Sequence, residues 1–453
     1  MAITEKLCDL TVTEAAAAIA KGELTSLQLV NSCLERIDAL EEKIQAWVLI
    51  DRGGALETAH RLDQELRQGQ RRGPLHGIPM GIKDIFYTVG LRTEAGSPFW
   101  SGFVPSYDAA TVARLKEAGA IILGKTHTTQ FASLDPPPTC NPWNTAHTPG
   151  GSSSGSGAGV AAGMCLAALG SQTLGSVLRP AAFNGIVGFK AHYGRISAYG
   201  VVPVSWTLDH MGVLARTVAD AALVFQTIAG YDPRDHHSLD EIVPDCLSRL
   251  EGQKAPRLGL VRQYFFDHAD KEMQDHTISV VECLRQAAAE VKEVELPPSF
   301  PNIQDNGHTI QAVEAAAYHQ DMFAEHKNQY GPGIRKLIED GLTIQAAKYA
   351  RALQTRLQQY ADMEPLLYQI DAMLTPGAPG AAPHGLASTG SPVMQAPWTI
   401  MGVPTISLPT GLSKDGLPLA IQLVGSPLAE DRLLAVARWC ERVLDVYLRP
   451  PLG

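Results

Sequence analysis

Two serine- and glycine-rich stretches carry the residues of this sequence that could do chemistry. The first, TPGGSSSGSGAGVAAG, runs from Thr148 to Gly163 and holds four serines and six glycines in sixteen residues. The second, LGSQTLGSVLRPAAFNGIVGFK, runs from Leu169 to Lys190, and 24 steps separate Ser152 from Ser176. A helix of about twelve residues covers about 18 Å, and five or six extended residues return about that distance. The geometry therefore permits both serines to meet at one end of a helix–strand pair.

The glycine spacing in the first stretch favours a shaped backbone over a flexible linker. Gly155, Gly159 and Gly163 are four residues apart, so on a helix they form one stripe that lets another backbone approach closely. The apolar run VAAGMCLAAL follows directly, which a linker would not require. We expect a loop before Ser152 and a helix after it.

The residues around two shorter motif matches argue against the functions of those motifs. GAIILGKT, Gly119 to Thr126, matches the phosphate-binding pattern G-x-x-x-x-G-K-[ST]. Its four intervening residues are apolar and predict a buried strand, whose N–H groups bond to neighbouring strands instead of an anion. GSSSG matches G-x-S-x-G around Ser153, but a nucleophile elbow follows a buried strand, and CNPWNTAHTPG precedes this one. The sequence predicts neither nucleotide binding nor an elbow serine.

The longer motifs resemble a known family. GIKD around Lys83, PGGSSSGS around Ser152 and SQTLGSVLRPAAFNGIVGFK around Ser176 are similar to the amidase signature family of serine hydrolases. The likeness continues through LDHMGVLARTVADA and APWTIMGVPTISLPTG, and so covers most of the chain in order. It implies a Ser–cisSer–Lys triad without metal or cofactor. Ser176 would be the nucleophile, Ser152, after a cis peptide from Gly151, the proton relay, and Lys83 the base. The backbone N–H groups of Thr173, Leu174, Gly175 and Ser176 would form the oxyanion hole.

The surroundings of Lys83 suit the role that the resemblance implies. A base must be neutral to accept the proton of an attacking serine, and a free lysine has a pKa near ~10.4. Ile82, Ile85 and Phe86 can exclude water and disfavour the charged form. On a strand, Asp84 points to the opposite side and need not hold Lys83 charged.

The sequence departs from the family pattern in two places. Many relatives carry Thr-Asp-x-Gly-Gly-Ser where this chain has Gln172, Thr173, Leu174, Gly175 and Ser176 after Ser171. Gln172 lacks the acid's charge but can brace the loop through hydrogen bonds, and Leu174 does not readily adopt a positive φ. Leu178 and Arg179 stand where the glutaminase subunit of the tRNA-dependent amidotransferase has Arg and Gln. This difference counts against glutamine, and we expect Arg179 to bond carbonyls behind the loop.

The elements that must position these residues alternate between helix and strand. Thr25 and Gln28 fit a capping box at the start of an amphipathic helix. PRLGLVRQYF, MQDHTISVVECLRQAAAEV and KEVELP read in turn as strand, helix and strand. Alternation of this kind predicts an α/β fold with a largely buried sheet, and the resemblance implies a large mixed, twisted sheet sandwiched by helices. We expect an N-terminal helical segment over 1–62 and an α/β domain over 63–453, with a helical elaboration at about 231–360.

Composition excludes several other functions. The 453 residues carry a formal charge of −10 and no long basic run, which disfavours nucleic-acid binding. Seven scattered cysteines form no C-x-x-C pair and indicate reduced thiols. No run of 18 apolar residues and no signal-like start is present, so we expect a cytoplasmic protein without a membrane span. Several relatives are dimers, so the resemblance allows a homodimer.

The resemblance, together with the residues that carry it, implies an amide-bond hydrolase. It would act through an acyl-enzyme on a small, uncharged amide, and carbamates or esters are chemically close. One alternative is the glutaminase subunit of a tRNA-dependent amidotransferase, and another is a catalytically silent scaffold. Segments expected to line the pocket are 126–140, 197–206 and 318–323. The residues expected to bind substrate are Gln130, Phe131, Ser153 and Tyr199.

Overall fold

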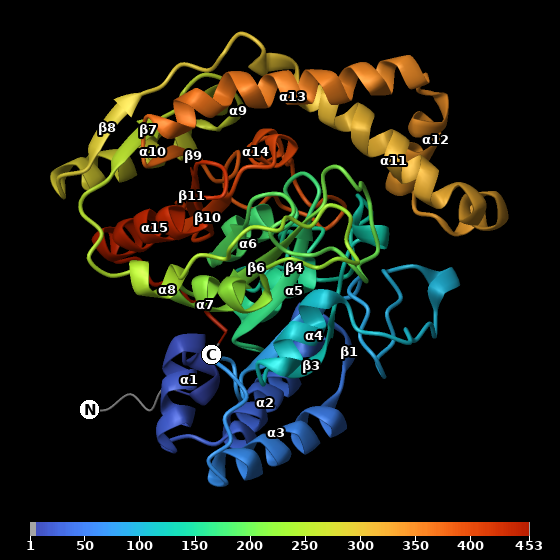
Figure 1. Ribbon diagram of the computed structural model, residues 1–453, viewed down its shortest axis with the longest axis vertical. Helices are drawn as coiled ribbons and strands as arrows, with labels where there is room; N and C mark the ends of the chain where they lie inside the picture. Colours follow the sequence, from blue (N-terminus) through green and yellow to red (C-terminus); the bar gives the residue numbers. More distant parts are fainter. Residues whose placement is uncertain (1–5, 453) are drawn as a thin grey trace.

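Short apolar runs between glycines become the strands of one eleven-stranded mixed sheet in the computed structural model, which describes residues 6–452 (Figure 1). The strands are β1 (Trp47–Ile50), β2 (Pro79–Lys83), β3 (Ile121–Thr126), β4 (Ala167–Gln172), β5 (Val187–Lys190), β6 (His210–Ala215), β7 (Arg257–Leu260), β8 (Glu290–Glu293), β9 (Ala372–Pro376), β10 (Thr405–Leu412) and β11 (Pro418–Val424). Their order across the sheet is β1-β3-β2-β4-β6-β5-β10-β11-β9-β7-β8. The predicted α/β fold with a mixed sheet is confirmed.

Helices cover both faces of this sheet. They are α1 (Val12–Lys21), α2 (Ser26–Ile44), α3 (Arg52–Arg67), α4 (Ala110–Glu117), α5 (Ser154–Ala161), α6 (Leu178–Asn184), α7 (Val218–Ile228), α8 (Cys246–Arg249), α9 (Phe265–His268), α10 (Lys271–Gln286), α11 (Ile303–His326), α12 (Pro332–Thr343), α13 (Ala346–Tyr368), α14 (Ala396–Met401) and α15 (Glu430–Leu444). Because helices flank both sides, every residue of β2, β3, β4, β5 and β6 is buried.

The pairing of the central strands brings the two serine-rich stretches to one edge of the sheet. β2 runs parallel to β3 and β4, and β4 runs antiparallel to β6, with Gln172 opposite His210. The carboxyl ends of β2 and β4 therefore lie at the same edge as the start of β6. Loops at this edge can gather residues that are far apart in the chain.

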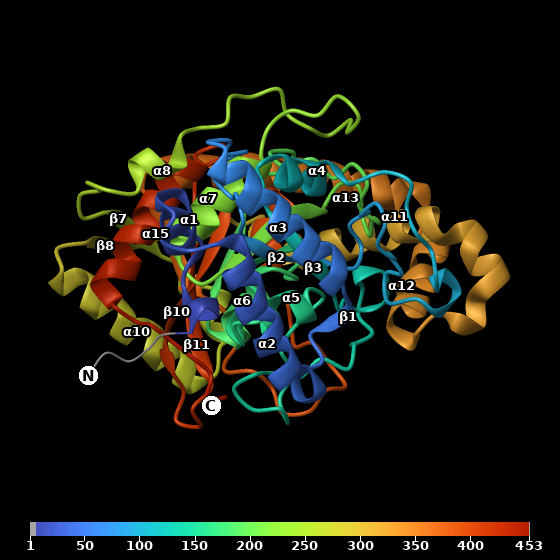
Figure 2. The ribbon, with the colours of Figure 1, turned by 90° about the horizontal axis from the view of Figure 1, so that it is seen from below.

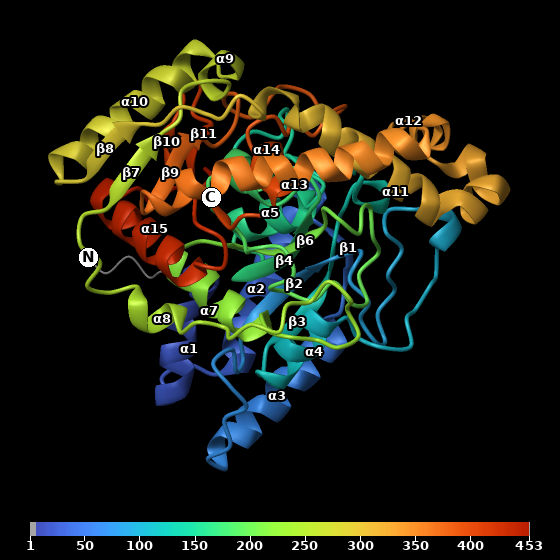
Figure 3. The same cartoon turned by 45° about the horizontal axis from the view of Figure 1, so that its top comes forward.

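The helices α11, α12 and α13 form a group of their own at one end of the molecule. In Figure 1 they lie opposite the N-terminal helices α1–α3, and in Figure 2 α11 and α12 extend to one side of the sheet. Figure 3 shows α13 running across the molecule beside α14. Most of this group falls inside 231–360, where a helical elaboration is expected, although α13 continues to Tyr368. That segment also supplies β7 and β8, which are parallel neighbours.

Several local expectations are confirmed and others need correction. The capping box at Thr25 and Gln28 begins α2, and GAIILGKT supplies the buried strand β3. The expected helical segment over 1–62 also contains β1, which pairs with β3. The helix after Ser153 has 8 residues and ends before Gly163, because Gly163 adopts a left-handed φ of 72°. Gly163 therefore lies outside the helix, and the prediction that it shares a helical stripe with Gly155 and Gly159 was wrong.

None of the helices within residues 6–452 has the length and apolarity needed to span a membrane.

Candidate active site

Lys83, the last residue of β2, ends in a fully buried polar pocket. Its Nζ lies 2.7 Å from Ser152 Oγ and 2.8 Å from Ser171 Oγ. Ser152 comes from the loop before α5, and Ser171 lies near the end of the neighbouring strand β4. The parallel pairing of β2 with β4 is therefore what places the amine between the two hydroxyls.

Burial makes the Lys83 amine a weaker base than the amine of a free lysine. Loss of solvation lowers its pKa to about 7, and the Asp209 carboxylate opposes this change. Within the described residues, Lys83 forms no ion pair; the neighbouring Asp84 lies 3.5 Å from Lys125 Nζ instead. Asp84 lies in the turn just after β2, so the argument from strand alternation does not apply to it. Its carboxylate is nevertheless paired with Lys125 and does not hold Lys83 charged. At neutral pH a large fraction of the Lys83 amines is uncharged and able to accept a proton.

The backbone around Ser152 is held from behind by Arg179. The Gly151–Ser152 peptide bond is cis. One terminal nitrogen of Arg179 donates to the Gly151 carbonyl at 2.6 Å, and the other donates to the Gly390 carbonyl at 2.8 Å. The expectation that Arg179 bonds carbonyls behind the loop is confirmed. Its guanidinium thus fixes the peptide that presents the Ser152 hydroxyl to Lys83.

Gln172 braces the loop that leads to Ser176. Its carbonyl oxygen accepts hydrogen bonds from the N–H groups of Val177 and Leu178 at 2.8 and 2.9 Å. Its amide nitrogen donates to Thr399 Oγ at 2.9 Å, and that hydroxyl donates to the Leu174 carbonyl at 2.7 Å. The bracing expected of Gln172 is confirmed, and a neutral side chain provides it.

The backbone N–H groups of this loop have no acceptor within the described residues. Among residues 6–452, no atom accepts a hydrogen bond from the backbone N–H of Thr173, Leu174, Gly175 or Ser176. Leu174 does not adopt a positive φ, so the loop needs no glycine there. Thr173 is tied down by its hydroxyl, which donates to Asp209 Oδ1 at 2.6 Å. These N–H groups are therefore free to bind a ligand atom, and their role as an oxyanion hole stays a prediction.

Ser176 lies beside the Ser152 segment with little exposure. Its exposed fraction is 8%, and its carbonyl accepts a hydrogen bond from the Ser153 N–H at 3.3 Å. The two serine-rich segments therefore lie side by side at this point, and the meeting of Ser152 with Ser176 itself stays a prediction. No hydrogen bond joins the Ser152 and Ser176 hydroxyls in the described part of the chain.

The four residues expected to bind substrate lie in different surroundings. Ser153 Oγ is buried against the backbone of Ser171. Gln130 accepts from the Gly331 N–H at 2.6 Å and donates to the Gln329 carbonyl. Phe131 is fully buried, with its ring centroid 4.6 Å from that of His319. Tyr199 is half-buried, with the Arg234 guanidinium 4.3 Å from its ring centroid. Their role in binding stays a prediction.

Three residues of the site were missed from the sequence: Ser171, Asp209 and Thr399. Each belongs to a stretch that carries the family resemblance, but no local pattern separates it from its neighbours. Their contacts join positions that are 36 to 227 residues apart in the chain, which is why periodicity and spacing could not find them.

Comparisons with known proteins agree with the geometry. The family model described as Amidase matches residues 28–434. The chain is 37% identical to a glutamyl-tRNA(Gln) amidotransferase subunit of Chloroflexus aggregans, over 98% of both chains. It resembles the native peptide amidase of Stenotrophomonas maltophilia, with a TM-score of 0.87, 30% identity and coverage of 98% and 99% of the two chains. It also resembles a protein of a vestigial complex that bears on the origins of an s-triazine catabolic enzyme. That match has a TM-score of 0.90, 27% identity and coverage of 97% and 100%.

The family match extends over nearly the whole chain and includes every stretch that contributes to the pocket around Lys83. The chain therefore belongs to the amidase family of hydrolases, which act on carbon–nitrogen bonds.

Proposed function

We propose that this protein hydrolyses an amide bond through an acyl-enzyme on Ser176, with Ser152 as proton relay and Lys83 as base. The observation that carries the proposal is the buried contact of 2.7 Å between Lys83 Nζ and Ser152 Oγ, together with the pKa of about 7 that burial gives to the amine. An amine in this state can take a proton at neutral pH, and a relay hydroxyl lets it act on a serine that it does not touch.

The proposed reaction has two halves. Ser176 Oγ attacks the amide carbon while its proton passes to Ser152, whose own proton passes to Lys83. The N–H groups of the loop from Thr173 to Ser176 stabilise the oxyanion, each contributing about 2.7–4 kcal/mol. The tetrahedral intermediate collapses, the C–N bond breaks, and the amine leaves with the proton returned through Ser152. Water then attacks the ester by the same route and releases the acid.

The name of the amidotransferase relative supports the glutaminase alternative better than the small-amide prediction. That relative is one subunit of a glutamyl-tRNA(Gln) amidotransferase, so glutamine would be the amide and a second subunit would be the partner. The solved complex among the structural matches also supports a protein partner. Glutamine is therefore one of two substrate candidates.

The residues after the nucleophile support the other candidate, an uncharged amide. Glutamine carries a carboxylate and an ammonium group, which need charged partners when water is excluded. Leu178 offers no charge, and both terminal nitrogens of Arg179 already donate to the protein. Both Asp209 oxygens likewise accept hydrogen bonds, from Thr173, Val204 and Ser205.

Labelling with a fluorophosphonate, followed by peptide mapping, tests the catalytic assignment. We expect the adduct on Ser176, and a loss of turnover of at least about 1000-fold in Ser176→Ala, Lys83→Ala and Ser152→Ala, with unchanged melting temperature as the control for folding. Full activity of Ser176→Ala would exclude Ser176 as the nucleophile. Absence of labelling and of turnover in the wild type would favour the silent scaffold.

A substrate panel separates the two candidates. Purified protein is assayed with glutamine, acetanilide, an aliphatic amide and an aryl carbamate. Turnover of the uncharged amides by the chain alone supports the small-amide candidate. Turnover of glutamine alone, and only with a second subunit present, supports the glutaminase.

A further inference from the structure

A cavity beside the proposed oxyanion loop has no role in the chemistry described above. Its volume is about 240 Å³, and its walls include Tyr193, Tyr199, Trp206, Met211 and Asp209. Asp209 links the cavity wall to the proposed oxyanion loop, because its carboxylate accepts the hydrogen bond from Thr173, three residues before Ser176. The cavity and the proposed oxyanion donors thus share one residue.

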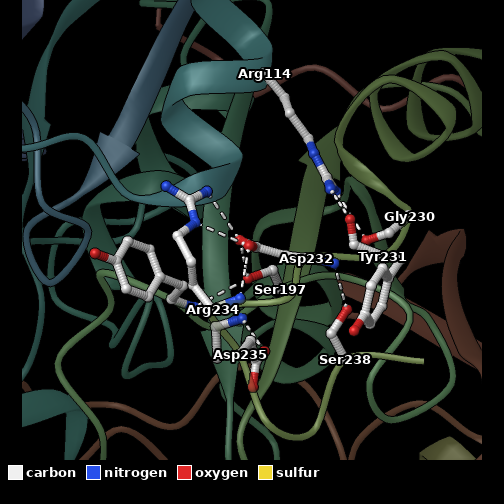
Figure 4. A network of polar contacts seen from close by, with 10 residues as sticks. Arg114, Ser197, Gly230, Tyr231, Asp232, Arg234, Asp235 and Ser238 are labelled. Carbon is white, nitrogen blue, oxygen red and sulfur yellow. Dashed lines mark hydrogen bonds and ion pairs between the residues drawn. The ribbon is translucent and has the colours of Figure 1, made fainter. Parts of the chain in front are cut away.

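The charged groups around the cavity are already satisfied by the protein. Arg234 donates to both oxygens of Asp232 at 2.8 and 3.0 Å (Figure 4). Asp235 accepts from the N–H groups of Ala198 and His237 at 2.8 and 2.9 Å. Since these charged groups have partners within the protein, the wall surface left for a ligand is mainly apolar. It comes from the aromatic rings, Met211 and aliphatic side chains such as Ile196 and Val201.

Trp206 is a wall residue whose backbone is held on both sides. Its side chain is 45% exposed, but its neighbours on both sides bind the buried carboxylate of Glu314 on α11, which accepts from the Ser205 hydroxyl and from the Thr207 N–H. The Tyr193 hydroxyl donates to the Trp206 carbonyl. An aromatic ring that is exposed yet held by its backbone is preorganised for contact with a ligand.

We infer that this cavity is a substrate subsite for an aromatic ring, with Trp206 as the residue that determines specificity and Glu314 as a positioning residue. The inference rests on the proposed function, since it names the substrate class of the same site. Aromatic rings stack or meet edge to face with a gain beyond simple burial. The preferred substrates would be aryl amides, such as anilides or benzamides.

The test compares aryl and saturated substrates in the same variants. Acetanilide is paired with N-cyclohexylacetamide, and benzamide with cyclohexanecarboxamide, so that size is nearly constant. We expect Trp206→Ala to lower kcat/KM about tenfold for the aryl member of at least one pair, and less than about twofold for its saturated member. Trp206→Phe should restore most of the loss. Glu314→Gln should lower kcat/KM for the aryl substrate about threefold, mainly by raising KM. It should leave kcat/KM for the saturated substrate unchanged.

Tyr231→Ala is the matched control. Tyr231 is also an exposed aromatic residue, at 49%, but it lies outside the walls of this cavity. We expect no change in the aryl preference. Equal losses for aryl and saturated substrates in Trp206→Ala, or no loss for either, would overturn the inference.

A binding measurement separates failure of the subsite from failure of the proposed function. Calorimetric titration of acetanilide and of benzamide into Ser176→Ala needs no turnover. Weakening of about tenfold by Trp206→Ala supports the subsite even if the wild type hydrolyses no amide, in which case only the proposed function fails. Binding that is independent of Trp206, or absent for both ligands, overturns the subsite whatever the enzyme hydrolyses.

Discussion

At the scale of single residues, the central feature is the amine of Lys83, which is fully buried and forms no ion pair among the described residues. Burial lowers the pKa of Lys83 to about 7, and the negative charge of Asp209 opposes this shift. The pKa of Asp209 is itself raised to about 6 by burial, so this carboxylate is mostly charged at neutral pH. Together these groups set the pH range in which Lys83 could serve as the proposed base.

We predict that kcat/KM rises with pH through about 7 and falls about tenfold per pH unit well below it. The sign follows from the role, because only the neutral amine accepts a proton and the charged form dominates below the pKa. Asp209→Asn removes a negative charge that favours the charged amine, so its acidic limb should move to lower pH. The pH–rate profile on one uncharged amide measures both effects. A flat profile between about pH 5.5 and 8.5 would contradict Lys83 as the base.

A second residue-scale prediction concerns Ser171, the other hydroxyl that contacts Lys83. Ser171→Ala removes a hydrogen bond of 2.8 Å to the amine, worth about 0.5–1.5 kcal/mol. We expect kcat to fall about tenfold while KM changes less than about twofold, because the amine loses one of its two hydroxyl partners. Ser279→Ala, on the exposed face of α10, is the control and should leave both constants unchanged.

At the scale of elements, the loop that ends at Ser176 is held by residues from α14 and from the start of β6. Thr399 on α14 connects Gln172 to the Leu174 carbonyl, so it sets the orientation of the peptide units that carry the proposed oxyanion donors. Thr399→Val keeps the shape and removes both hydrogen bonds. We expect kcat to fall by about tenfold to a hundredfold with KM within about threefold. Thr343→Val removes a hydroxyl from the exposed end of α12 and should have no effect; equal effects of the two variants would refute the role of Thr399.

At the scale of the whole molecule, close backbone contact joins three distant parts of the chain at Gly155 on α5. A Cβ there would lie 2.1 Å from the Ala46 carbonyl oxygen and 2.5 Å from the His127 nitrogen. Gly155→Ala should therefore lower the free energy of unfolding by about 1–3 kcal/mol. Gly53→Ala is the matched control, because its Cβ would meet nothing within 4 Å on helix α3 and should be neutral or stabilising. Urea denaturation of both variants measures the difference.

The sequence by itself determined what local pattern and motif can encode. Alternating apolar runs indicated the α/β class, the capping box at Thr25 marked the start of α2, and the apolar neighbours of Lys83 indicated its burial. The residues before Ser153 excluded a nucleophile elbow, and the apolar character of residues 120–123 excluded a phosphate loop in favour of β3. These conclusions depend on neighbours within a few positions, so they could be drawn without the fold.

Only the tertiary structure decided which distant groups meet. Parallel pairing of β2 with β4 put Ser171 against Lys83, and antiparallel pairing of β4 with β6 brought Asp209 to Thr173. It also placed Glu314 of α11 behind Trp206 and so shaped the aromatic cavity. Strand order and helix docking result from the packing of the whole core, and a hydroxyl or carboxylate carries no local sign of the partner that this packing will bring to it.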